Sequence, residues 1–549
     1  MKLYEILFNE LYQQGVRKIF GIPGDFALNL FEALALYEKL QLVTFSHEPA
    51  VGFAADGASR ISNGLAVCCV TYGAGGLNML NSVACAYAEM SPLVVISGGP
   101  GKIEKESGIL VHHQVKSFDT QINVYREVVE YAAILDDPRT AALHIRRAID
   151  TALQKSRPVY LEVPRDMVFA EIEESESFGG IELKINHEAL KEASQEIIVR
   201  LNSSRMPVLI VGVEAHRYRL QEKVLHLAEK LQIPVASSFL GRGIFPVRHQ
   251  QFIGTYLGTA SPEAMRRVVE SSDCLLMLGV MMTDTSLGIL PETVNASNTI
   301  LCVSRSVAAK QHVYHDVPLN LLIDALLDSS ELPRKGNSLP QEKMDVSPSV
   351  NELIPPNSPI RVTHLIQVLN DFVDQHPELP LVADTGDCLF ASVDIRSNQL
   401  IAPSFYGTMG FAVPAGMGVQ LAGGKRPLIL VGDGAFQMTG SEISQAPRYG
   451  LNPIIVLFNN SRWEMLQVFF PHAKYNENIP WPFAKLAESW GGRGFEVRTS
   501  EELRSGLAAA WEETRFVLMD VHLEKGDISP ILREFVKGVK GKVHSRSGG

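Results

Sequence analysis

Leu428-Ile-Leu-Val-Gly-Asp-Gly-Ala-Phe-Gln437, followed by Ile454-Ile-Val-Leu-Phe-Asn-Asn460, is the part of this sequence that decides the fold. Each segment is a run of aliphatic residues that ends in glycine or polar residues, which is typical of a short buried strand. Residues 435–458 are enough for one crossover helix and its loops. The pattern predicts a βαβ unit in which Asp433 and Asn460 follow two parallel strands and meet at one edge of the sheet.

This edge carries residue types that suit a phosphate held together with a metal ion. Gly434 lets a ligand approach the backbone closely, and the N-terminus of the following helix offers free N–H groups and a positive dipole end. The Asp433 carboxylate and the Asn460 amide oxygen are hard ligands that suit Mg²⁺ or Ca²⁺. Gly-Asp-Gly alone is also compatible with a tight turn without a ligand, but the Asn-Asn pair after the next strand favours the phosphate and metal site.

Length and composition set limits on the class of protein. With 549 residues the chain exceeds one hydrophobic core, so we expect about three domains. The net charge of −11 predicts no nucleic-acid or anionic membrane partner, and no apolar run predicts a transmembrane helix. Glutamates interrupt the apolar N-terminal segment, which argues against a signal peptide. The six cysteines are scattered, so we expect reduced core thiols in a cytoplasmic protein.

Alternating helix and strand patterns indicate an α/β protein with three doubly wound parallel-sheet domains. The first is expected over residues 1–180, and the second, which is Rossmann-like but has no Gly-x-Gly-x-x-Gly, over 190–333. Residues 334–359 are rich in Pro, Ser and Asn and indicate an exposed linker. The third domain is expected over 360–535, and residues 536–549 as a mobile tail.

The first and third domains share a pattern that indicates an internal repeat. Phe53 with its Ala-rich helix, a strand and the Gly73-x-Gly75 turn parallel Phe411, a strand and the Gly432-Asp-Gly434 turn. We therefore expect two copies of one α/β domain, of which only the second keeps a metal-binding aspartate.

Gly432-Asp-Gly434 with Asn459-Asn460 resembles the cofactor motif of thiamine diphosphate enzymes. Gly21-Ile-Pro-Gly-Asp-Phe-Ala-Leu28 and Ser46-His-Glu-Pro-Ala-Val-Gly-Phe-Ala-Ala-Asp56 resemble the 2-oxo acid decarboxylases of that family, and the phenylpyruvate and indolepyruvate type in particular. The resemblance covers nearly the whole chain and implies thiamine diphosphate and Mg²⁺ as cofactors. It also implies that the three domains are the pyrimidine-binding, central and diphosphate-binding domains of such an enzyme.

Four residues of the first domain are implied in catalysis. Glu48 suits the first turn of a helix in any protein, but in the resembling segment it contacts the pyrimidine ring and helps to form the C2 ylid. His112 and His113 resemble a His-His motif that steadies a carboxylate or moves protons, whereas a zinc site would need further ligands that the sequence does not identify. Asp25 suits a turn, and the resemblance implies that it reaches the reacting centre.

The resemblance assigns the cofactor residues of the third domain by position. Met409 corresponds to the bulky residue that bends the cofactor, and the Gly407 carbonyl to the partner of the aminopyrimidine. Asp387 is expected near the pyrimidine, and the carbonyl of Arg462 as a backbone ligand of the metal. The residues implied in binding cofactor and metal are Glu48, Asp387, Gly407, Met409, Asp433, Gly434, Ala435, Asn460, Arg462 and Met465.

One departure from the family concerns the substrate. Pyruvate decarboxylases carry a glutamate six residues past the metal-binding asparagine, and here that position is Leu466. Glu464 faces elsewhere if it shares a helix with Leu466. A leucine enlarges the pocket and makes it more apolar, with Met465 lining it, which favours an aryl group over a methyl group. The expected substrate pocket consists of Asp25, His112, His113, Met465 and Leu466.

The expected reaction is the non-oxidative decarboxylation of phenylpyruvate or indole-3-pyruvate to the aldehyde and CO₂, through a thiamine ylid and an enamine. Alternatives are an enzyme for pyruvate or branched-chain oxo acids, a carboligase related to acetohydroxyacid synthase, and an inactive binding protein of the same fold. Because the family places its cofactor between two subunits, Glu48 of one chain is expected to serve Asp433 and Asn460 of another. We therefore expect at least a homodimer, and a homotetramer as the full assembly.

Overall fold

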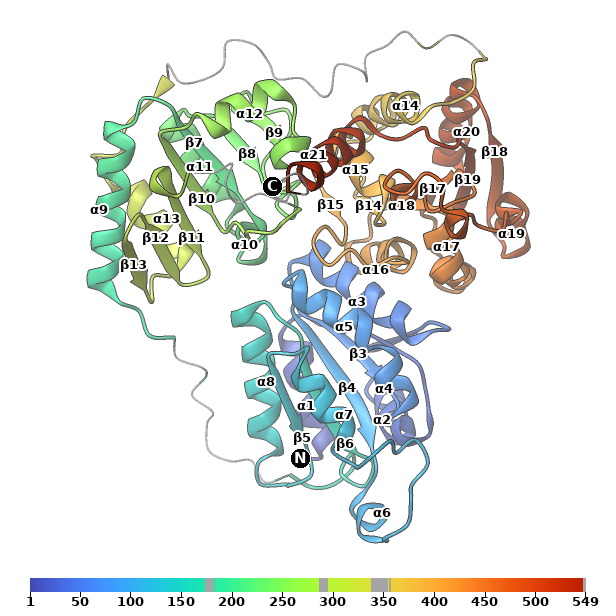
Figure 1. The fold of residues 1–549 in the computed structure, drawn as a ribbon. Helices are drawn as coiled ribbons and strands as arrows, with labels where there is room; N and C mark the ends of the chain where they lie inside the picture. The colour runs from blue at the N-terminus through green and yellow to red at the C-terminus, as the bar shows by residue number, and fades with distance from the viewer. Residues whose placement is uncertain (173–179, 181–182, 286–294, 337–353, 355–356, 547–549) are drawn as a thin grey trace. The chain divides into compact units, whose positions relative to one another are not determined.

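The computed structural model describes residues 1–549 except 173–179, 181–182, 286–294, 337–353, 355–356 and 547–549. Within the described residues, helices cover three sheets, of which two have six strands and one has seven (Figure 1). The predicted α/β class with three mostly parallel sheets is confirmed. Most of the predicted linker over 334–359 lies outside the described residues.

Contacts between residues divide the chain into two compact units. The first unit consists of residues 1–183, 410–427 and 436–453, and the second of residues 184–409, 428–435 and 454–549. The first sheet lies in the first unit, and strands of the other two sheets lie in the second.

The first sheet has the strand order β2-β1-β3-β4-β6-β5, and all its pairs are parallel. Every residue of β3 and β4 is buried, because a parallel strand covered on both faces is apolar along its whole length. The strands are β1 (Lys18–Gly21), β2 (Gln41–Thr44), β3 (Ala66–Val70), β4 (Leu93–Gly99), β5 (Tyr131–Ile134) and β6 (Val159–Pro164). The helices of this part are α1 (Leu3–Gln13), α2 (Leu28–Leu36), α3 (Glu48–Ser62), α4 (Ala74–Asn78), α5 (Leu80–Ala88), α6 (Lys102–Glu106), α7 (Thr120–Arg126) and α8 (Ala141–Lys155).

The last sheet has the order β15-β14-β16-β17-β19-β18, which matches the first sheet position for position and confirms the predicted internal repeat. Its strands are β14 (Leu381–Ala383), β15 (Leu400–Ile401), β16 (Leu428–Gly432), β17 (Ile454–Asn459), β18 (Arg493–Val497) and β19 (Val517–His522). The predicted βαβ unit is β16 and β17, which pair in parallel with Leu428 opposite Ile454. The connection is not one regular helix, because α17 (Asp433–Thr439) continues as a 3₁₀ segment, η7 (Gly440–Tyr449), that contains Pro447.

Helices equivalent in the repeat pack against each other in the first unit. A Cβ atom on Gly57 of α3 would lie 2.3 Å from the carbonyl oxygen of Ala415, and one on Gly418 of α16 (Ala412–Gly423) only 1.9 Å from that of Ala54. Both glycines are therefore required by close approach of the two helix backbones.

The central sheet has the order β13-β12-β11-β10-β7-β8-β9. The expectation of a purely parallel sheet is wrong at one edge, where β11 pairs antiparallel with β12, and β12 with β13. The reason is connection length, because two residues join each pair of these strands and such short turns form only hairpins. The strands are β7 (Pro207–Val211), β8 (Val235–Ser237), β9 (Phe252–Thr255), β10 (Cys274–Leu278), β11 (Thr299–Val303), β12 (Ser306–Ala309) and β13 (His312–His315). The helices of this part are α9 (His187–Ser203), α10 (Val213–Arg217), α11 (Gln221–Leu231), α12 (Glu263–Glu270) and α13 (Leu319–Asp328).

The C-terminal segment, predicted as a mobile tail over 536–549, is helical up to residue 546. Helix α21 (Pro530–Arg546) continues through most of it, and Val536 and Val539 pack on the core beside the last sheet. These apolar positions are spaced as on one face of a helix, a signal that the many lysines and glycines of the segment obscure. The other helices of this part are α14 (Val362–Gln375), α15 (Asp387–Val393), α18 (Glu464–Gln467), α19 (Phe483–Ser489) and α20 (Ser500–Glu512).

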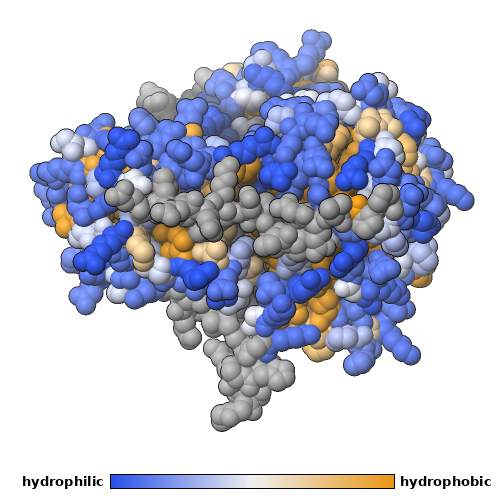
Figure 2. All heavy atoms as spheres, turned by 90° about the horizontal axis from the view of Figure 1, so that it is seen from above, coloured by the Kyte–Doolittle hydropathy of each residue, from blue (hydrophilic) through white to orange (hydrophobic). Residues whose placement is uncertain are grey.

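The surface and the cysteines agree with the composition. On the face drawn in Figure 2, hydrophilic side chains predominate and hydrophobic ones lie between them. All six cysteines are free and buried, as expected for core thiols. Among the described residues, no helix has the length and apolar character needed to cross a membrane.

Candidate functional site

A cavity of 330 Å³ lies in the second unit, where the strands of the last sheet end. Its described lining includes the ten residues that the sequence assigned to this domain: Asp387, Gly407, Met409, Asp433, Gly434, Ala435, Asn460, Arg462, Met465 and Leu466. The topology explains this convergence, because β14, β16 and β17 are adjacent parallel strands and end at the same edge.

Asp433 and Asn460 are polar residues of the cavity lining. Both side chains are buried, and burial raises the pKa of Asp433 to about 6, although Asn478 donates a hydrogen bond to its carboxylate at 3.4 Å. A buried carboxylate that lacks a cationic partner is costly, and a bound cation would lower that cost. The carbonyl of Arg462 accepts one hydrogen bond from the Glu464 N–H and keeps a second lone pair for a ligand. The donor set therefore fits Mg²⁺.

Trp463 provides an independent test of whether an anion fits beside this metal site. Its indole N–H is buried and has no hydrogen-bond partner among the described residues. The indole nitrogen lies 2.3 Å from the position that a Cβ on Gly434 would occupy. An unsatisfied buried donor costs about 1–3 kcal/mol, so a bound acceptor would stabilise this arrangement. A diphosphate supplies such an acceptor, and the residues present fit the group.

Asp387 has a second set of contacts that the sequence does not indicate. It begins α15, lines the cavity, and accepts hydrogen bonds from the Ser529 hydroxyl and from the Ser529 N–H at 2.9 Å. Burial raises the pKa of Asp387 to about 7, despite these hydrogen bonds. Asp387 therefore connects the cavity wall to the residue that precedes α21.

Other residues of the cavity lining are apolar and aromatic. Phe390 lies between Phe239 and Phe535, with ring centroids 6.0 and 5.0 Å away. Met465 and Leu466 line the cavity from α18, and Leu466 keeps 49% of its surface exposed. Glu464 also borders the cavity, but both its oxygens accept hydrogen bonds from the Arg462 guanidinium, at 2.6 and 2.9 Å.

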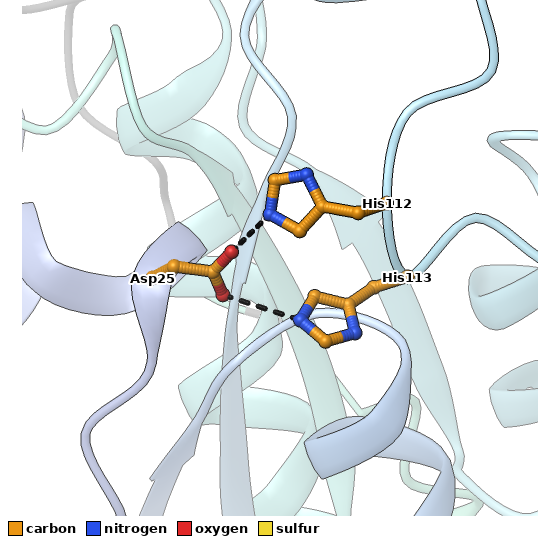
Figure 3. Close-up of side chains that lie close together, drawn as sticks. All are labelled: Asp25, His112 and His113. Carbon is orange, nitrogen blue, oxygen red and sulfur yellow. Dashed lines mark hydrogen bonds and ion pairs between the residues drawn. The ribbon is translucent and has the colours of Figure 1, made fainter.

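A second cluster lies in the first unit. Asp25 begins a short 3₁₀ segment, separated from the end of β1 by three residues, and it faces His112 and His113, which lie in the loop between α6 and α7 (Figure 3). The Nε2 atom of His112 pairs with one carboxylate oxygen, and that of His113 lies 3.5 Å from the other. Although partial burial raises the pKa of Asp25, hydrogen bonds from His112, the Phe26 N–H and Thr71 outweigh it and lower this pKa. The carboxylate is therefore held in its charged form.

Neighbouring side chains fix the geometry of this Asp–His–His cluster. The hydroxyl of Thr71 donates to Asp25 at 3.2 Å, and the ring of Phe26 stacks on His112 with centroids 4.7 Å apart. His113 has a φ of 67°, which is unfavourable for a residue with a side chain. Gly73 leaves room for it, because a Cβ there would lie 2.3 Å from the His113 carbonyl oxygen.

The turn that carries Gly73 is held in place by a hydrogen bond to the side chain of Gln121. The buried side chain of Gln121 accepts a hydrogen bond from the Gly73 N–H at 2.6 Å and donates to the Tyr160 hydroxyl at 2.6 Å. Neither Thr71 nor Gln121 was predicted from the sequence. Thr71 lies 46 residues from Asp25, and Gln121 lies 48 residues from Gly73, so no local pattern marks them.

Among the described residues, Glu48 is neither part of the cavity lining nor a hydrogen-bond partner of the Asp25, His112 and His113 cluster. It is the first residue of α3, is only partly buried, and accepts a hydrogen bond from Asn78 at 2.7 Å. Glu442, which the sequence did not indicate, is buried nearby and accepts a hydrogen bond from the Ser46 N–H at 2.9 Å. Burial raises the pKa of Glu442, and the charge of Glu48 adds to this effect. The single chain leaves Glu48 less buried than its implied role requires.

Three family profiles match successive parts of this chain. They are described as thiamine pyrophosphate enzyme, N-terminal TPP binding domain (residues 1–123), central domain (194–328) and C-terminal TPP binding domain (384–521). The chain therefore belongs to the family of thiamine pyrophosphate enzymes. The family and the thiamine diphosphate cofactor predicted from the sequence are confirmed.

Relatives within the family are decarboxylases. Indole-3-pyruvate decarboxylase of Azospirillum brasilense is 43% identical, over 98% of this chain and 98% of that protein. Pyruvate decarboxylase isozyme 3 of Saccharomyces cerevisiae is 28% identical, over 90% of this chain and 89% of that protein. Pyruvate decarboxylase 1 of Pisum sativum is 28% identical, over 96% of this chain and 91% of that protein.

Proposed function

We propose that this protein catalyses the non-oxidative decarboxylation of an aromatic 2-oxo acid, phenylpyruvate or indole-3-pyruvate, to the aldehyde and CO₂. The observation that carries the proposal is the apolar part of the cavity lining, which has Leu466 in place of a glutamate and includes the aromatic side chains of Phe239, Phe390 and Phe535. Burying an aryl group against such a wall gains about 25 cal/mol per Å², which a methyl group cannot match. The higher identity to an indole-3-pyruvate decarboxylase supports the same substrate class.

Residues of the second unit are proposed to bind the cofactor. Thiamine diphosphate, when bound, supplies the electron sink that accepts the electron pair of the broken carbon–carbon bond. Asp433, Asn460 and the Arg462 carbonyl would hold Mg²⁺ against the diphosphate, next to Gly434. Met409, Gly407 and Asp387 would orient the two rings, and Ala435 would provide a backbone contact to the diphosphate. These roles are supported by the common lining of one cavity.

Residues of the first unit are proposed to handle protons. The Asp25 carboxylate is hydrogen-bonded to Nε2 of His112 and lies 3.5 Å from Nε2 of His113, so this group can hold a proton and deliver it to the product carbon. The imidazoles would also steady the carboxylate of the incoming acid. Glu48 would share a proton with the cofactor's pyrimidine nitrogen, which requires a more buried environment than the single chain provides.

We propose that two chains are needed for one active site, and that the protein is a homodimer or a homotetramer. The described lining of the cavity belongs to the second unit, whereas Glu48 lies in the first and is only partly buried. Large apolar side chains, including Ile109, Leu110 and Tyr475, are exposed in the single chain. Where such groups form a contiguous patch, they are typical of surfaces that a partner covers. The free, buried cysteines support a reducing compartment, and we propose the cytoplasm.

The substrate proposal is tested with a panel of 2-oxo acids. Purified protein is incubated with thiamine diphosphate, Mg²⁺ and phenylpyruvate, indole-3-pyruvate, a branched-chain oxo acid or pyruvate, and CO₂ and aldehyde are measured. We expect kcat/KM to be highest for an aromatic acid. Fast turnover of pyruvate without turnover of either aromatic acid would contradict the proposal.

A further inference from the structure

The Asp–His–His cluster has the ligand geometry of a metal site. One oxygen of Asp25 and one ring nitrogen each of His112 and His113 all lie within 4.8 Å of one another. Figure 3 shows both imidazoles turned toward the same carboxylate. Bonds to zinc are about 2.0–2.2 Å long for nitrogen and oxygen, so ligands of one ion lie roughly 3–3.5 Å apart. Small rotations of exposed side chains would bring the three atoms to that spacing.

The chemistry of the cluster selects the metal. Two imidazole nitrogens and one carboxylate suit Zn²⁺, Co²⁺, Ni²⁺ or Cu²⁺ and are a poor set for Mg²⁺, which prefers oxygen. The proposed Mg²⁺ site is the reverse, since Asp433, Asn460 and a carbonyl offer only oxygen atoms. The chain therefore holds two sites with opposite preferences, and Mg²⁺ would not fill both.

The cluster is both accessible and held in place. The exposed fractions are 63% for the His112 side chain, 33% for that of His113 and 39% for that of Asp25, so an ion can enter and keep water in its remaining positions. The hydrogen bond from Thr71 and the ring of Phe26 orient the ligands, and such outer contacts strengthen metal sites.

We propose that Asp25, His112 and His113 form a binding site for one divalent transition-metal ion of the zinc type, and that occupation of this site inhibits the enzyme. Binding requires a lone pair on each Nε2, so any proton there moves to Nδ1 or is released, and the hydrogen bonds to Asp25 are replaced by bonds to the metal. The metal-bound atoms, which are the two Nε2 atoms and one Asp25 oxygen, then no longer hold or transfer a proton. Metal binding stands on the geometry alone, whereas inhibition rests on the proposed function.

Binding is tested with Co²⁺ as a coloured probe for zinc. The protein loaded with thiamine diphosphate and excess Mg²⁺ is titrated with Co²⁺, and its visible absorption and bound equivalents are recorded before displacement by Zn²⁺. We expect one equivalent of Co²⁺ to bind, with a visible absorption spectrum that indicates imidazole ligands. His112→Ala, His113→Ala and Asp25→Asn should each weaken this binding at least about tenfold. His472→Ala is the matched control, because His472 is exposed and lies outside the cluster.

Circular dichroism and thermal unfolding establish that each variant is folded, and His112→Asn and His113→Asn provide second substitutions of similar shape. The proposal is overturned if folded variants of all three positions bind Co²⁺ as the unchanged protein does. It is equally overturned if the unchanged protein binds no Co²⁺ beyond the Mg²⁺ site.

Inhibition is measured separately from binding. Turnover of the best 2-oxo acid is followed while Zn²⁺ is added at constant excess Mg²⁺, and a zinc-selective chelator is then supplied. Loss of activity at the occupancy seen by absorption, with recovery on chelation, supports the regulatory role, and full activity at saturating Zn²⁺ overturns it. If no oxo acid is turned over, the proposed function fails while the Co²⁺ spectrum still reports on the metal site.

Discussion

Asp433 illustrates how one buried carboxylate couples the metal to pH. Burial raises its pKa to about 6, because the charged form is poorly solvated inside the protein. A metal ion binds the charged form, so below this pKa a proton competes with the ion. The same burial means that the charged carboxylate destabilises the metal-free fold, and the ion removes this penalty.

We therefore expect stabilisation by Mg²⁺ and cofactor to depend on pH. Because the folded pKa of Asp433 lies above its ordinary value, the contribution of this group to stability is complete at low pH and is lost as pH rises through about 6 in the metal-free protein. Mg²⁺ with thiamine diphosphate should raise the Tm more at pH 7.5 than at pH 5.5. Scanning calorimetry with and without ligands measures this, and Asp433→Asn should lose the difference.

Trp463 allows a prediction about the diphosphate. If its buried indole N–H donates to the bound anion, Trp463→Phe should weaken cofactor binding roughly tenfold or more, since a hydrogen bond to a charged group contributes about 1.5–3 kcal/mol. Titration calorimetry in the presence of Mg²⁺ gives the Kd. Trp481→Phe serves as the control, and equal affinities of both variants would argue against the contact.

Leu466 allows a prediction about the substrate. Leu466→Glu returns a carboxylate to the apolar wall, which penalises an aryl group and restores a polar group for a small acid. The ratio of kcat/KM for the aromatic acid to that for pyruvate should fall by at least about tenfold, a change of ~1.4 kcal/mol. Leu466→Met keeps the pocket apolar and should leave the ratio within a few-fold. If Leu466→Glu left this ratio unchanged, Leu466 would not determine the substrate specificity.

Among the elements, the packing of α3 on α16 depends on having no side chain at two positions. Gly418→Ala would place a methyl group 1.9 Å from the Ala54 carbonyl oxygen, so the helices must move apart. We expect a loss of about 1–3 kcal/mol in the free energy of unfolding, as for other overpacked sites. Urea unfolding measures it. Gly506→Ala in α20 has only ordinary contacts with Met519 and should be neutral or stabilising.

The elements also show which structure a sequence pattern can reveal. The strands β16 and β17 were predicted correctly because they are short, continuous apolar runs that end in glycine or asparagine. The antiparallel hairpins of β11 to β13 were not predicted. A strand pattern does not tell whether neighbouring strands are parallel or antiparallel, and here only the two-residue connections do so. The sequence does not predict helix α21, because lysines and glycines dominate the composition of its C-terminal part.

The residues of the candidate site likewise divide into those that the sequence predicts and those that it does not. Residues with a motif around them, such as Glu48, Asp433 and Asn460, could be predicted from a family resemblance. Thr71, Gln121 and Trp463 could not, because their roles come from contacts with residues distant in sequence or from the absence of a partner. The sequence around these three residues has the same composition as ordinary core segments.

For the whole molecule, the central prediction is that active sites are shared between chains. Glu48→Gln and Asp433→Ala are each expected to be inactive, but a mixed dimer would combine the intact Glu48 of one chain with the intact Asp433 of the other. If half of the dimers are mixed and each has one of two sites intact, activity should recover to roughly a quarter of the unchanged protein. The two proteins are mixed under conditions that exchange subunits and then assayed. No recovery despite exchange would place each site within a single chain.

The division of the chain into two units has a consequence for its dissection. The backbone passes from one unit to the other five times, since the first unit takes α16 and part of the α17–η7 connection from the region of the last sheet. A single break therefore cannot release the first unit intact, and residues 1–183 alone would lose the helix against which Gly57 packs. The two repeated parts are therefore inseparable within this chain, and a substitution at their α3–α16 contact affects both.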